Sequence, residues 1–106
     1  MLSNLRIMTN SAQHIPETGS LTLLQFYADW CQPCKMMMPI VASIMKKDYE
    51  WLTILQVDVD QEQAMASQYN VRSIPTFVVL KENQEVWRNS GMLSERSLTE
   101  ELTSLR

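Results

Sequence analysis

Glycine, histidine and cysteine are all scarce in this sequence of 106 residues. The only glycines are Gly19 and Gly91, so the chain has no glycine-rich loop of the kind that cradles phosphate groups. His14 is the only histidine, and there are two cysteines. One chain therefore cannot supply the four Cys and His ligands of a zinc site, and we expect no metal site.

An excess of positive charge and long apolar runs are also missing. The chain has 9 Lys and Arg against 12 Asp and Glu, a net charge of −3, and no basic cluster. Binding to nucleic acid or to an anionic membrane is therefore not expected. No apolar stretch approaches the length of a membrane-spanning helix, and residues 1–10 lack the apolar run of a signal peptide. We expect a cytoplasmic protein with one domain over residues 1–106, and a monomer.

The spacing of apolar residues predicts strands that alternate with helices. Strands are expected over residues 21–28 and 51–59, both buried, and over 75–80 and 85–90, which a polar turn at 81–84 joins into a hairpin. Helices are expected over residues 31–47 with a kink at Pro39, from a capping box of Asp60 and Gln63 to Tyr69, and after Ser94. A less distinct edge strand over residues 4–9 and a short helix ending near Glu17 precede them.

Strands linked by a helix run parallel, and strands linked by a tight turn run antiparallel. In the last helix Leu98, Leu102 and Leu105 lie on one stripe, which suits a helix that covers a sheet. The sequence therefore predicts an α/β fold in which a central mixed β-sheet is flanked by helices on both faces.

Cys31 and Cys34 follow a predicted buried strand and open a predicted helix. Residues three apart in the first helical turn share a face, so the two sulfur atoms can come within bonding distance. Cys31 lies at the helix start, where free N–H groups and the helix dipole favour a thiolate, whereas Cys34 lies one turn deeper. We interpret the pair as a reversible dithiol/disulfide with Cys31 as nucleophile and Cys34 as resolving thiol. Two inert buried cysteines are the alternative interpretation.

Residues 26–35, Phe-Tyr-Ala-Asp-Trp-Cys-Gln-Pro-Cys-Lys, resemble the active-site segment of the thioredoxin family. Trp30 precedes the first cysteine and Lys35 follows the second, as in that family. Pro39 matches the proline inside the family's second helix.

Two further segments are similar to thioredoxins. Residues 71–77, Val-Arg-Ser-Ile-Pro-Thr-Phe, resemble the family's cis-proline segment, and Gly91 matches a glycine of its substrate groove. The resemblance extends from about residue 20 to the end of the chain. It is specific because several motifs occur together at the right separations.

The resemblance implies the thioredoxin fold and a protein-disulfide reductase. It implies a cis Ile74–Pro75 peptide, which would let the backbone of Ile74 pair with an extended substrate. The active-site motif and groove would comprise Trp30, Gln32, Pro33, Lys35, Ile74, Pro75 and Gly91. It also implies protein disulfide substrates, a thioredoxin reductase as electron donor, roles in electron transport and cell redox homeostasis, and no cofactor held by this chain.

Three positions depart from the family pattern. Gln32 stands where the family usually has glycine. Gln25 replaces an aspartate six residues before the first cysteine, and Gln56 replaces its lysine partner on the next strand. We expect both glutamines to be buried and to modulate the cysteine chemistry, because a buried ion pair can be replaced by neutral groups only as a unit. Without a carboxylate base, resolution by Cys34 is expected to be slow at neutral pH and to accelerate as pH rises.

Two other functions are compatible with these residues. A disulfide isomerase or oxidant would use the same cysteines at a different reduction potential. A thioredoxin-fold binding or chaperone module would keep the fold, with the dithiol incidental to its function. The presence of both cysteines together with the groove residues favours the reductase.

Overall fold

The computed structural model describes residues 20–106, in which four strands form one mixed sheet. The strands are β1 (Leu21–Tyr27), β2 (Leu52–Asp58), β3 (Thr76–Lys81) and β4 (Gln84–Ser90), in the spatial order β2-β1-β3-β4. β1 pairs with β2 in parallel, and β3 pairs with both β1 and β4 in antiparallel fashion. The predicted mixed sheet is confirmed, whereas the strand expected at 4–9 and the helix expected near Glu17 lie outside the described residues.

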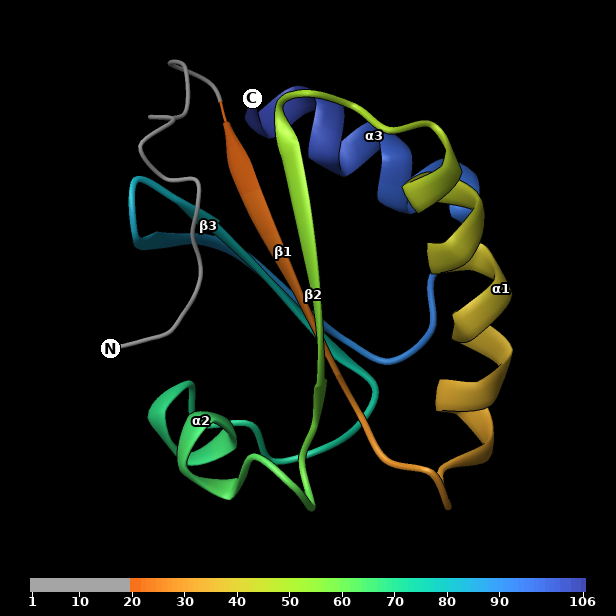
Figure 1. The fold of residues 1–106 in the computed structure, drawn as a ribbon, viewed down its shortest axis with the longest axis vertical. Coiled ribbons are helices and arrows are strands. Elements are labelled where there is room, and N and C mark those ends of the chain that lie inside the picture. The colour runs from red at the N-terminus through yellow and green to blue at the C-terminus, as the bar shows by residue number, and fades with distance from the viewer. Residues whose placement is uncertain (1–19) are drawn as a thin grey trace.

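Three helices cover the two faces of this sheet. α1 (Gln32–Lys46) and α3 (Glu95–Leu105) lie on one face, and the short α2 (Gln63–Gln68) lies on the other (Figure 1). Ser94 caps α3 as predicted, since its hydroxyl accepts the backbone N–H of Ser97 at 3.0 Å. Pro39 lies inside α1, which continues past it to Lys46.

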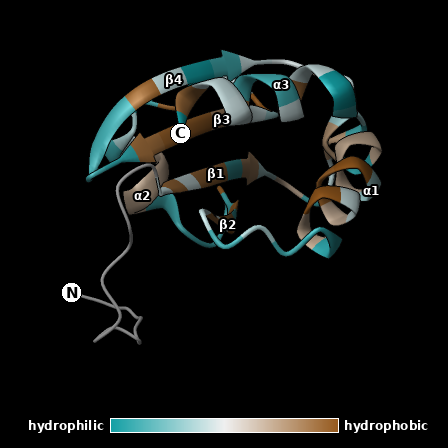
Figure 2. Ribbon diagram, turned by 90° about the horizontal axis from the view of Figure 1, so that it is seen from above, coloured by the Kyte–Doolittle hydropathy of each residue, from teal (hydrophilic) through white to brown (hydrophobic). Residues whose placement is uncertain are grey.

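The alternation of side chains along β1 divides the core into two layers. Leu21 and Leu23 pack toward α1 and α3, in a cluster that also contains Met37, Val41, Ile44, Phe77, Val79, Leu98 and Leu102. Leu24 and Phe26 face the other way, toward Val57, Val78 and the residues of α2 and its following loop. β3 is apolar along most of its length, whereas the outer strand β4 is largely hydrophilic (Figure 2).

Two sequence-based expectations were wrong. The strand at 51–59 is not buried, because β2 forms one edge of the sheet made by residues 20–106 and only its Val57 is buried. The predicted capping box is also absent: α2 begins after Glu62, which makes no side-chain capping bond. The carboxylate of Asp58 instead accepts the N–H of Asp60 at 2.9 Å, so the acidic residues here form a turn rather than a helix cap.

Candidate active site

The segments that the sequence singled out come together at one end of the sheet, where the strands β1 and β2 finish. The parallel strands β1 and β2 both end there, and the two antiparallel strands have Thr76 opposite Phe26 and Ser90 opposite Thr76. The segments that contain the cysteines, Pro75 and Gly91 therefore meet at this end. The backbone N–H of Gly91 donates to the carbonyl of Pro75 at 2.8 Å, which joins two of them directly.

Cys31 and Cys34 form a disulfide, with their Cα atoms 5.2 Å apart. Cys31 is the N-cap of α1, and its sulfur accepts the backbone N–H of Cys34 at 3.2 Å. Cys34 is fully buried, and Cys31 is 5% exposed. Gln32, Pro33 and Lys35 are exposed, so the first turn of α1 turns these neighbours to solvent, leaves a small part of Cys31 accessible and covers Cys34.

The rim around the disulfide is formed from three separate segments. Trp30 is 68% exposed, and its indole N–H donates to the carboxylate of Asp60 at 2.9 Å. Ile74 packs against the cluster of Ala28, Cys31 and Cys34, and the peptide between Ile74 and Pro75 is cis, as expected. Gly91 has a φ of 102°, a backbone conformation that favours glycine.

Gln25 and Gln56 lie beside each other on paired strands. They are register partners between β1 and β2, and the side-chain N–H of Gln56 donates to the carbonyl oxygen of Gln25 at 2.9 Å. Both amide nitrogens also face the sulfur of Met38 on α1, at 3.8 Å for Gln25 and 3.5 Å for Gln56. The expected pair of neutral amides is therefore present.

The expected burial of this pair holds for only one member. Gln25 is fully buried, as predicted, but Gln56 is exposed. The cause is the edge position of β2, which leaves much of Gln56 open to solvent while its amide nitrogen reaches inward to Gln25. The pair thus connects the buried space between β1 and α1 to the surface.

Comparison with known proteins gives a consistent result. The thioredoxin family model matches residues 6–104. A thioredoxin of Chlamydia trachomatis is 41% identical over 80 residues, which are 76% of this chain and 78% of that protein. Thioredoxin-1 of Drosophila yakuba is 36% identical over 105 residues, covering 98% of this chain and 97% of that protein. The chain belongs to the thioredoxin family.

The thioredoxin fold is equally clear from structural comparison. The X-ray structure of Fasciola hepatica thioredoxin superposes with a TM-score of 0.77 at 38% identity, covering 84% of each chain. Family membership and a cysteine pair at disulfide distance together identify a thiol–disulfide oxidoreductase with protein-disulfide reductase activity.

Two residues beside this thioredoxin site were not recognised in the sequence. Asp60 was interpreted as a helix cap, yet it holds the indole of Trp30. The carboxyl ends of neighbouring parallel strands meet at one edge of a sheet, so the position of Asp60 just after β2 was a usable signal. Met38 lies in a run of three methionines, and nothing in that run indicates that its sulfur faces two amides.

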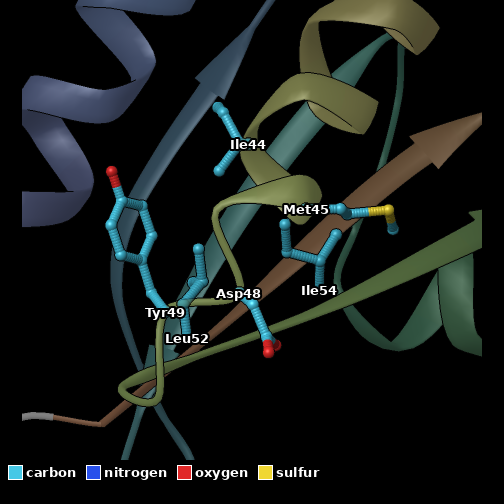
Figure 3. A pocket seen from close by; sticks show the side chains of 6 residues that line it. All are labelled: Ile44, Met45, Asp48, Tyr49, Leu52 and Ile54. Carbon is cyan, nitrogen blue, oxygen red and sulfur yellow. The ribbon is translucent and has the colours of Figure 1, made fainter.

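A hollow lies away from the disulfide, between the C-terminal end of α1 and β2. It is lined by Ile44, Met45, Asp48, Tyr49, Leu52 and Ile54 (Figure 3). Most of the residues that line it are apolar, and neither cysteine is among them. Within residues 20–106, no helix has both the length and the apolar character needed to cross a bilayer.

Proposed function

We propose that Cys31 is the attacking thiol and Cys34 the resolving thiol of this reductase. The observation that carries the assignment is the asymmetry of the pair: Cys31 is the helix N-cap at the surface, and Cys34 is completely covered. The thiolate of Cys31 attacks a substrate disulfide, forming a Cys31–substrate bond and releasing one substrate thiolate. Cys34 then attacks Cys31, which closes the internal disulfide and releases the second substrate thiol.

Helix N-termini favour a thiolate over a thiol, whose ordinary pKa is about 8.5, and we propose that Cys31 uses this effect once the disulfide is reduced. A value near 7 requires about 2 kcal/mol of differential stabilisation. The helix dipole typically supplies about 0.3–1 kcal/mol. The N–H of Cys34, which donates to the sulfur of Cys31 in the disulfide, is placed to supply part of the remainder when Cys31 is a thiolate.

The proposed substrate is an extended segment of another protein that carries a disulfide. Trp30, Ile74, Pro75 and Gly91 surround the cysteines and would contact it, with Ile74 offering its backbone as a pairing edge. We propose that Gln32, Pro33 and Lys35 complete the motif. In the cell, a thioredoxin reductase would return two electrons to the Cys31–Cys34 disulfide, and we place the protein in the cytoplasm as a monomer.

The test compares Cys31→Ser with Cys34→Ser on a model peptide that contains one disulfide. Cys31→Ser should abolish reduction of the peptide, because no other thiolate stands at a helix start in residues 20–106. Cys34→Ser should accumulate a mixed disulfide with the peptide, visible by mass spectrometry. If Cys34→Ser turns over like the wild type, the assignment of roles is wrong. Equilibration of the pair against a glutathione buffer separates a reductase from an oxidant or isomerase.

A further inference from the structure

Gln25 is the one fully buried side-chain amide in residues 20–106. A buried amide needs partners for its carbonyl and for its N–H groups, and the identity of those partners fixes which end points where. The carbonyl oxygen of Gln25 accepts from Gln56 on β2. Its nitrogen is therefore directed to the α1 side, where the sulfur of Met38 lies at 3.8 Å.

This orientation turns the N–H groups of Gln25 toward the face of α1 that carries Cys34. Cys34 and Met38 are four residues apart on α1, so their side chains share one face of the helix. The nitrogen of Gln25 has two hydrogens, and a distant thioether is a weak acceptor that occupies at most one of them. The other remains available when charge develops on the neighbouring cysteine.

A charged side chain beside Cys34 could stabilise a thiolate there in place of the Gln25 amide. Cys34 packs in an apolar cluster with Ala28, Cys31, Tyr27, Val59 and Ile74. The charged residues nearest to the cysteines in sequence, Asp29 and Lys35, are exposed, as is Asp60, which bonds Trp30. Asp58, the register partner of Tyr27, is half-buried, and its carboxylate accepts the backbone N–H groups of Asp60 and Gln61. A thiolate at Cys34 would thus form in a buried, apolar setting, where a directed N–H has its greatest effect.

We propose that the Gln25 amide, oriented by Gln56, stabilises the thiolate of Cys34 by hydrogen-bond donation while Cys34 resolves the mixed disulfide. Gln25 does not act as a base. The Cys34–Cys31 bond forms, the Cys31–substrate bond breaks, and the departing substrate sulfur retains the electron pair of the broken bond. That sulfur takes up one proton, which balances the proton released by Cys34.

The proposal rests on the reductase function, but its test does not require turnover. In a Cys31→Ser background, the ionisation of Cys34 is followed by the ultraviolet absorbance of the thiolate over roughly pH 6 to 11. Adding Gln25→Leu should raise the pKa of Cys34 by about one unit, which corresponds to about tenfold less thiolate at neutral pH. A leucine side chain suits this apolar layer, and the exposed Gln56 can hydrate, so the variant should fold; circular dichroism verifies this.

Two further variants separate a directed N–H from altered packing or polarity. Gln56→Leu keeps the Gln25 amide but removes its orienting bond, and should raise the pKa of Cys34 by a smaller amount. Met38→Leu keeps that bond and the size of the side chain, and should leave this pKa within a few tenths of a unit. An unchanged pKa in Gln25→Leu or in Gln56→Leu overturns the proposal. A shift in Met38→Leu as large as that in Gln25→Leu also overturns it, because packing would then be the cause.

Kinetics with both cysteines present give the functional counterpart. Gln25→Leu should slow decay of the mixed disulfide at neutral pH by about tenfold and leave its formation by Cys31 unchanged. Equal slowing of both steps would contradict a role specific to Cys34. If no mixed disulfide forms even with the wild type, the reductase assignment fails, whereas the titration of Cys34 still tests the amide.

Discussion

At the C-terminal end of α1, away from the cysteines, Val41 and Ile44 pack against Leu21 and Leu23 in an apolar cluster. At the N-terminal end of α1, one turn from Cys34, the sulfur of Met38 faces two glutamine amides. Both ends lie between α1 and the same face of the sheet. The C-terminal end contributes stability through apolar burial, and the N-terminal end keeps a polar amide where the reaction needs a thiolate to form. A substitution should therefore affect stability alone at one end and thiol chemistry at the other.

The sharpest test of the apolar cluster is Met37→Ala, because Met37 belongs to that cluster although it lies next to Met38 in α1. Met37 is fully buried, so truncation should lower the free energy of unfolding by about 2–5 kcal/mol. The pH profile of the resolving step should not change, because Met37 contacts the apolar cluster rather than the amides. Denaturant unfolding measures the first quantity and single-turnover kinetics the second. Met36→Ala is the matched control: Met36 is 60% exposed, and its truncation should cost less than about 0.5 kcal/mol.

At the polar end, Gln25→Asp should lower stability by on the order of 2 kcal/mol at neutral pH. Burial raises the pKa of the new carboxyl group above its unfolded value of about 3.9, so the acid is neutral in the fold and ionises on unfolding. The loss should be small near pH 4 and increase as pH rises toward the folded pKa. Unfolding measured across this range tests the sign.

The same variant should change the chemistry. The ionised form of the new carboxyl group can accept the proton of Cys34, so resolution should accelerate over the wild type as pH approaches the raised pKa of that group, while the wild-type rate also climbs with pH. Adding Gln56→Lys should recover part of the lost stability, which makes the two changes non-additive. A wild-type rate that is flat between about pH 6 and 10, or no acceleration in Gln25→Asp, would show that another group takes the proton.

A smaller effect is expected at the helix that covers the apolar end. Ser94→Ala removes the hydroxyl that accepts the N–H of Ser97 and should cost about 1 kcal/mol. Leu98 and Leu102 join α3 to the apolar cluster, so the loss should appear in unfolding and not in the ionisation of Cys34. Ser94→Asp is the control, since aspartate is also a good N-cap and should retain most of the stability.

The smallest effect should arise outside both ends, at the ion pair of Glu85 and Arg88 on β4. The hydrogen bond from Arg88 lowers the pKa of the Glu85 carboxyl group. A lowered pKa contributes stability above the unfolded pKa and loses it as pH falls through the folded value. Glu85→Gln should therefore cost about 0.2–1 kcal/mol at pH 7, and the difference from wild type should vanish in acid. A difference that persists in acid would mean that the ion pair is not its source.

Much of this protein follows from local sequence. The apolar run at 21–28, the hairpin and the serine before the last helix each predicted the element observed, because burial pattern and capping are local effects. The cysteine spacing placed both sulfurs at one helix start. The cis peptide at Ile74–Pro75 was expected only from the resemblance of residues 71–77 to the thioredoxin family's cis-proline segment. The capping box failed because the carboxylate of Asp60 accepts the indole N–H of Trp30, a residue 30 positions away, instead of a helix N–H.

Contacts between distant segments were decided only by the tertiary structure. The exposure of Gln56 depends on β2 lying at an edge of the described sheet, and strand order is not encoded in any one strand. The bond from Trp30 to Asp60 and the position of Met38 against two amides join residues that are 13 to 30 positions apart. The sequence by itself determined which residues carry the redox chemistry, because a dithiol needs only two cysteines at a helix start. Their polar surroundings were set by packing, since a side-chain amide takes its direction from whichever partners the fold brings to it.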